Sequence, residues 1–255
     1  MRIRTTTLLL YYPTVLIIVA MGMLIAVLIP SYYALLPEFI MSLLFIYTLG
    51  KLHGKLGIGY SYVVTIILIV LLSYASVFLI RPSLFLNKAL IEMKQSLFRG
   101  SLYLVTYLFL SLLPDSATDL VGTLPIFLLV TAIAVLELRL RHYVLAGILT
   151  GIVGIGVSTV VLSLMFNRVI VTYGLSAMTM GLMGLTLMAS LINTVKRPGR
   201  LMHFLNFLII LYTVYESIWL LIPIPPVLII GGVGINRLGH FISMLAGIII
   251  AIFIT

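Results

Sequence analysis

Apolar runs of about 20 residues follow one another along this chain, and short segments between them hold most of its charged residues. Each run is long enough to cross a bilayer core of ~30 Å as a helix. The pattern predicts eight spans, near residues 8–29, 33–49, 58–80, 120–138, 143–165, 174–195, 202–222 and 238–254. We therefore expect an all-α, polytopic helical membrane protein.

Two segments depart from this pattern. Residues 81–119 are too polar to span cleanly, and the piece from Ser96 to Leu113 is amphipathic and rich in Tyr and Phe. Such a piece suits a helix lying in the membrane interface or a hairpin dipping into it. Residues 223–236 carry three prolines and three glycines, so we expect them to be non-helical.

Composition agrees with a membrane protein and leaves no room for a soluble domain. Hydrophobic residues make up 63% of the chain and charged residues 8%, and the mean hydropathy is +1.31. There are no cysteines, and the four histidines and six acidic residues are dispersed, so neither thiol chemistry nor a metal site is expected. We expect no cofactor.

The net charge of +9 is explained by topology and does not indicate a nucleic-acid partner. With the N-terminus in the cytoplasm, the inner side receives Arg2, Arg4, Lys51, Lys55, Arg139, Arg141, Lys196, Arg197 and Arg200. The outer side receives Arg81, Lys88, Lys94, Arg99, Arg168 and Arg237, four of them in the one long loop. We expect a multi-pass protein of the cell membrane with a cytoplasmic N-terminus.

Candidate chemistry lies at the starts of two predicted spans. Ser176 follows Gly174 at the start of one, and His240 opens the other. These spans are separated by a single span, so they run parallel, and both residues lie at nearly the same depth below the outer surface. A hydroxyl nucleophile needs a base within hydrogen-bond reach, and His240 is the natural partner of Ser176.

Small residues accompany both positions at helical spacing, which permits two membrane helices to approach closely. The expected packing residues are Gly174, Ala177, Gly181, Gly184, Ser243 and Gly247.

At these residues the chain resembles the rhomboid family of intramembrane serine proteases, whose pattern is Gly-x-Ser-Gly opening one helix and a histidine with small residues opening a later one. Glu137-Leu-Arg139 and Phe98-Arg99 are similar to two further family signatures. The resemblance implies a six-helix core at 58–255, preceded by an N-terminal transmembrane hairpin at 1–57. It further implies a Ser176–His240 dyad that cleaves transmembrane protein substrates near the outer face of the bilayer.

Two departures from the family pattern concern the reaction. Ala177 replaces the glycine after the serine, and the stretch from Asp119 to Ile126 lacks the His and Asn, four residues apart, that help donate to the oxyanion. Losing one such donor typically costs ~10²–10³ in rate. The backbone N–H groups of Leu175 and Ser176, at a helix start, are the remaining candidate donors.

The span at 202–222 lies between the serine and histidine spans and ends in a proline-rich segment. Its residues Tyr212, Tyr215 and Trp219 share one face with Glu216, and the resemblance implies a lateral gate for substrate, against an aromatic interface belt as the alternative. Two other functions stay open: a catalytically inactive relative that binds transmembrane helices, and a small transporter or channel component. Dispersed intramembrane charges and an inverted repeat, both typical of transporters, are not evident.

Overall fold

The computed structural model describes residues 68–69, 72–73, 76, 83–114, 119, 123, 126–127, 130–131, 134, 138–167, 169–170, 172, 174–196, 210–211, 223–230 and 233–254. Most of these residues are helical. In chain order the elements are α4 (Ser83–Met93), α5 (Leu97–Leu110), α7 (Leu140–Met165), α8 (Leu175–Lys196), β1 (Val227–Ile230), β2 (Val233–Asn236) and α10 (Arg237–Ile254).

Three helices, α7, α8 and α10, are long and apolar enough to cross a membrane. They correspond to the predicted spans 143–165, 174–195 and 238–254, with each start shifted by one to three residues. The predicted spans 8–29 and 33–49, and with them the N-terminal hairpin at 1–57, lie outside the described residues, as does most of 58–80, 120–138 and 202–222.

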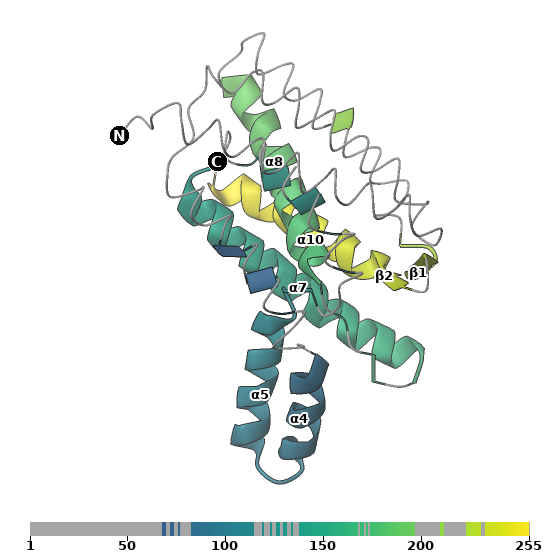
Figure 1. Cartoon of the computed structure of the whole chain (residues 1–255). Coiled ribbons are helices and arrows are strands. Elements are labelled where there is room, and N and C mark those ends of the chain that lie inside the picture. Colours follow the sequence, from purple (N-terminus) through teal and green to yellow (C-terminus); the bar gives the residue numbers. More distant parts are fainter. Residues whose placement is uncertain are drawn as a thin grey trace.

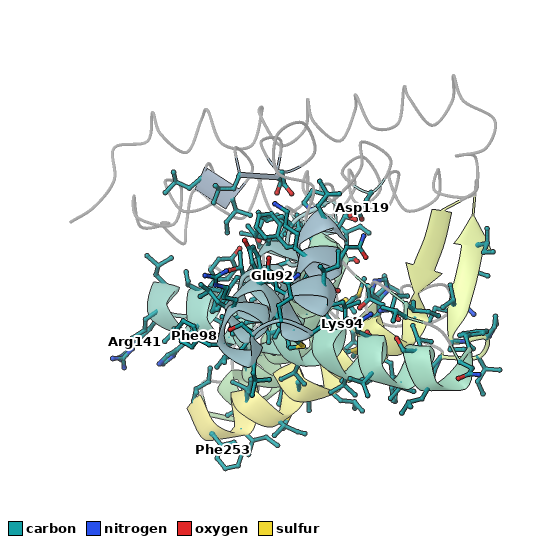
Figure 2. The ribbon with its side chains drawn as sticks, turned by 90° about the horizontal axis from the view of Figure 1, so that it is seen from below. Glu92, Lys94, Phe98, Asp119, Arg141 and Phe253 are labelled. Carbon is teal, nitrogen blue, oxygen red and sulfur yellow. The ribbon has the colours of Figure 1, made fainter. Side chains whose placement is uncertain are left out.

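Helix α7 packs antiparallel to both α8 and α10. Along the α7–α8 contact, Gly151 faces Met178 and Gly147 faces Leu182, so the residue numbers run in opposite directions. Along the α7–α10 contact, Gly154 faces Ser243 and Ser158 faces Gly239, again in opposite directions. Helices α8 and α10 are therefore parallel to each other. In Figure 2, Arg141 near the start of α7 and Phe253 near the end of α10 lie at one end of the molecule and the strands lie at the other, which agrees with the antiparallel direction of α7 and α10.

Helix α8 occupies the centre of this group. Within the apolar window of α8 72% of the residues are buried, against 39% for α7 and 33% for α10. Two of its threonines, Thr179 and Thr186, donate their hydroxyls to carbonyls one turn earlier, which satisfies them without water. By contrast, α7 and α10 each expose a large apolar face, which is the arrangement expected of lipid-facing helices.

Helices α4 and α5 form a hairpin that projects away from the three long helices (Figure 1). Ser96 caps α5 by accepting a hydrogen bond from the Arg99 N–H. Gly100 lets the two helices approach, since a Cβ there would come within 2.7 Å of the Met93 backbone. The segment from Ser96 to Leu113, expected to be an interfacial helix or part of a hairpin, is the second arm of this hairpin.

The described residues of the proline- and glycine-rich segment, 223–230 and 233–236, are non-helical, as predicted, and they form a two-stranded antiparallel sheet that was not predicted from the sequence. Val227 pairs with Asn236 and Ile230 pairs with Val233. The sheet leads directly into α10, where the Leu238 N–H donates to the Pro226 carbonyl. The β-hairpin thus fixes where the first turn of α10 begins.

Candidate functional site at the starts of helices α8 and α10

Gly174 sets the geometry of the chain directly before Ser176. Its φ of 126° lies in the left-handed region, which a side chain would strain. Its N–H donates to the Ser111 carbonyl at 2.8 Å, which ties the segment to the end of α5. Leu175 and Ala177 are buried, whereas Ser176 between them is only half-buried. The hydroxyl of Ser176 is therefore placed in the first turn of α8 and remains reachable.

His240 lies in the first turn of α10 and is only 4% exposed, with its Nδ1 atom fully buried. The start of α10 is capped by Asn236, whose Oδ1 accepts from the Gly239 N–H at 2.9 Å. Immediately before the histidine, Gly239 leaves no space for a side chain, because a Cβ would lie 2.9 Å from both Asn236 Cγ and Ser158 Oγ. The imidazole is thus held inside the bundle at a capped helix start.

The contacts that α8 and α10 make along α7 give the relative depths of Ser176 and His240. Ser176 precedes Met178, which faces Gly151, and His240 follows Gly239, which faces Ser158. Counted along the antiparallel contacts, the two residues lie at levels of α7 that differ by four residues, or about 6 Å at 1.5 Å per residue. The parallel direction of α8 and α10 agrees with the sequence-based expectation, whereas a depth difference of about 6 Å is larger than the nearly equal depth expected for Ser176 and His240.

Four of the six small residues singled out in the sequence lie where helices touch: Gly181, Gly184, Ser243 and Gly247. A Cβ on Gly247 would overlap the Gly181 carbonyl oxygen and come 2.8 Å from the Leu185 N. A Cβ on Gly184 would overlap the Met244 carbonyl oxygen, and one on Gly154 would overlap the Ser243 hydroxyl. The backbones of α8 and α10 are therefore in direct contact, which lets the two helix starts approach each other.

Asp119 lies near the serine and is hydrogen-bonded to Thr123, although neither residue was predicted to belong to the site. A Cβ on Gly174 would lie 3.1 Å and 3.2 Å from the Asp119 carboxylate oxygens and 3.2 Å from Ser176 Oγ. Thr123, four residues on, donates its hydroxyl to Asp119 Oδ1 at 3.0 Å. The stretch noted for lacking the oxyanion His and Asn thus places a carboxylate and a hydroxyl at the same four-residue spacing next to the serine.

Other functional candidates lie elsewhere. Tyr212, Tyr215 and Trp219, the predicted gate residues, fall outside the described residues, as does Glu137. Phe98 and Arg99 lie on the exposed side of α5. Asn236 and Ser158 were not singled out in the sequence, although an asparagine immediately before a helix start is a capping signal.

The chain matches no family model, no curated protein and no solved structure.

Proposed function

We propose that this protein is an intramembrane serine endopeptidase of the rhomboid type, with Ser176 as nucleophile and His240 as general base. One observation carries the proposal: α8 and α10 are parallel, fastened backbone to backbone through Gly181, Gly184 and Gly247, and begin at one end with a serine and a buried histidine. Close packing of this kind is what small residues provide between membrane helices. The proposal requires that the hydroxyl of Ser176 and the imidazole of His240, far apart in sequence, come within hydrogen-bond reach of each other.

In the proposed reaction, Ser176 Oγ attacks the scissile carbonyl carbon while its proton passes to His240. The C–N bond then breaks, and His240 returns the proton to the leaving amine. Water hydrolyses the resulting ester and regenerates the hydroxyl. Developing negative charge on the carbonyl oxygen is met by the N–H groups of Leu175 and Ser176, because first-turn N–H groups have no partner within their own helix.

The substrate class follows from the surroundings of the site. The helices that carry Ser176 and His240 are each long and apolar enough to cross a membrane, so the natural substrate is a transmembrane segment. Its scissile bond becomes accessible only where the segment unwinds, since helical carbonyls are hydrogen-bonded and shielded. The hydrolytic water reaches a serine located at a helix start more easily than one at mid-membrane.

A second candidate function is a non-cleaving relative that binds transmembrane helices. The carboxylate of Asp119 beside Gly174 and Ser176 favours this alternative, because a negative charge there opposes formation of an oxyanion.

The test separates these two functions with one reagent and one substrate panel. A fluorophosphonate should label the purified wild-type protein in proteoliposomes, and Ser176→Ala and His240→Ala should abolish both labelling and cleavage of transmembrane substrates. Ser101→Ala and His142→Ala, both outside the proposed site, serve as matched controls and should behave as wild type. Absence of labelling together with retained binding of a transmembrane peptide would instead establish the non-cleaving alternative.

A further inference from the structure

The side chain of Asn236 makes two different hydrogen bonds at the start of α10. Its Oδ1 accepts from the Gly239 N–H at 2.9 Å, which caps the helix. Its Nδ2 donates to Ser158 Oγ of α7 at 2.8 Å, across 78 positions of sequence. A cap alone needs only the acceptor oxygen, so the second bond is an additional tie between α10 and α7.

The same turn of α7 also holds the segment that leads to the serine. Thr172 Oγ1 donates to the Ile155 carbonyl at 3.1 Å and lies 3.5 Å from Ser158 Oγ. It also forms a hydrogen bond with the hydroxyl of Thr159. From the other side, the buried hydroxyl of Tyr107 donates to the Thr172 carbonyl at 2.6 Å. Residues 155–159 of α7 are thus hydrogen-bonded both to Thr172, in the segment that leads into α8 (the lead-in, residues 169–174), and to Asn236, which caps α10.

We infer that Asn236 is a positioning residue for the proposed dyad: through Ser158 and Thr172 it sets the start of α10, with His240, relative to the start of α8, with Ser176. This inference rests on the proposed function. The tie is short, since Gly239 directly precedes His240 and Thr172 lies four residues before Ser176. A misplacement of about 1 Å between reacting groups can cost ~10²-fold in rate, so a tie of this kind has a measurable effect.

Three substitutions distinguish the effect of the hydrogen bond between Asn236 and Ser158 from the effect of the helix cap on Gly239. Asn236→Ser keeps an acceptor for the Gly239 N–H, but its side chain is too short to donate to Ser158. Asn236→Ala removes both bonds, and Ser158→Ala removes the tie from the α7 side. Asn87→Ser, at an exposed position of α4, is the matched control.

We expect Asn236→Ser to slow fluorophosphonate labelling of Ser176 and to lower kcat by about tenfold or more, with KM unchanged. Its melting temperature should stay close to wild type because the cap is retained, whereas Asn236→Ala should also lower the melting temperature. Ser158→Ala should reproduce the rate loss, and the double variant Asn236→Ser/Ser158→Ala should be no slower than either single variant. Rate losses that simply multiply in the double variant would overturn the inference.

A second readout does not depend on activity. The chain has no cysteines, so spin labels can be attached at Val169→Cys in the lead-in of α8 and Ile229→Cys in β1, both at exposed positions. The distance distribution between the labels should broaden in Asn236→Ser and in Ser158→Ala but not in Asn87→Ser. Broadening in a protein that no fluorophosphonate labels would refute the peptidase and keep the structural tie. An unchanged distribution in both variants, with wild-type labelling, refutes the tie and keeps the peptidase.

Discussion

At the scale of single residues, Gly174 explains how the serine is presented. Its left-handed backbone turns the chain into α8, and the space its missing side chain leaves is shared by Ser176 Oγ and the Asp119 carboxylate. The most informative neighbour of the serine is therefore an acid. An ionised carboxylate beside a developing oxyanion is unfavourable, whereas an amide there would donate to it.

We predict that Asp119→Asn raises the rate of fluorophosphonate labelling and of substrate cleavage by about tenfold or more, since one oxyanion donor is worth ~10²–10³. The amide oxygen can keep the hydrogen bond from Thr123, and the amide nitrogen replaces a carboxylate oxygen. Asp119→Leu, which removes the charge without adding a donor, is the control and should give a smaller gain. If Asp119→Asn is as inactive as Ser176→Ala, the carboxylate itself takes part in the reaction.

At the scale of elements, the three long helices are held by contacts between backbones, because glycines occupy the crossing points. Gly247 of α10 lies against Gly181 and Leu185 of α8, and Gly184 lies against the Met244 carbonyl. Because these contacts are to backbone atoms, a side chain added at Gly247 or Gly184 could be accommodated only if one of the helices moved. The pairing of α8 with α10 should therefore be far more sensitive to added volume than the outer faces of these helices.

Gly247→Ala tests this pairing. We expect it to destabilise the protein by about 1–3 kcal/mol or more, because overpacking a tight contact displaces backbone and not only a side-chain end. Gly156→Ala on α7 is the matched control, since its Cβ would meet only Leu108 Cδ2 at 3.8 Å, and it should be neutral or slightly stabilising. The measurement is the melting temperature in detergent. Equal melting temperatures for the two variants would contradict the packing.

The α4–α5 hairpin is tied to the site through its second helix. The hydroxyl of Tyr107 bonds the Thr172 carbonyl, and the Ser111 carbonyl bonds the Gly174 N–H, so both bonds end on the lead-in of α8. Leu97 and Phe98, at the other end of α5 from these two hydrogen bonds, are exposed. The orientation of the hairpin and the position of Ser176 are therefore coupled.

Removing the hydroxyl in Tyr107→Phe should cost about 1–3 kcal/mol of stability, because the buried Thr172 carbonyl loses a donor. It should also slow labelling of Ser176. Tyr103→Phe, one turn earlier on the same helix and less buried, should change stability by no more than about 0.5 kcal/mol. Thermal unfolding and labelling rates of the two variants check this. A loss of stability with an unaltered labelling rate would mean that the hydrogen bond does not position the serine.

At the scale of the whole molecule, features set by periodicity were predictable from sequence and features set by tertiary contact were not. Long apolar runs predict α7, α8 and α10 because burial and backbone satisfaction in lipid favour helices of that length. The strands 227–230 and 233–236 are too short and too close to prolines to be distinguished from irregular loop. The bond from Asn236 to Ser158 joins residues far apart in sequence, and no local pattern encodes it.

The two ends of the bundle carry different parts of the chain. Arg141 and Phe253 lie at one end, and the β-hairpin lies at the other together with the start of α10 (Figure 2). A cytoplasmic N-terminus, inferred from the positions of basic residues, places the end with the β-hairpin on the outer face. We therefore predict that the proposed site opens toward the outside of the cell.

This orientation is testable because the chain contains no cysteine, so single cysteines can be introduced without a background. In intact cells, a membrane-impermeant maleimide should label Ile229→Cys, which lies at an exposed position of β1, and should label His142→Cys only after the membrane is permeabilised. His142 is chosen over its basic neighbour Arg141 because replacing it leaves the charges that set topology in place. The opposite labelling pattern would mean that the chain is inserted in the opposite orientation, with the proposed hydrolysis at the cytoplasmic face. Labelling of both cysteines in intact cells would instead mean that α7 and α10 do not cross the membrane, and a peptidase acting on transmembrane segments would no longer fit.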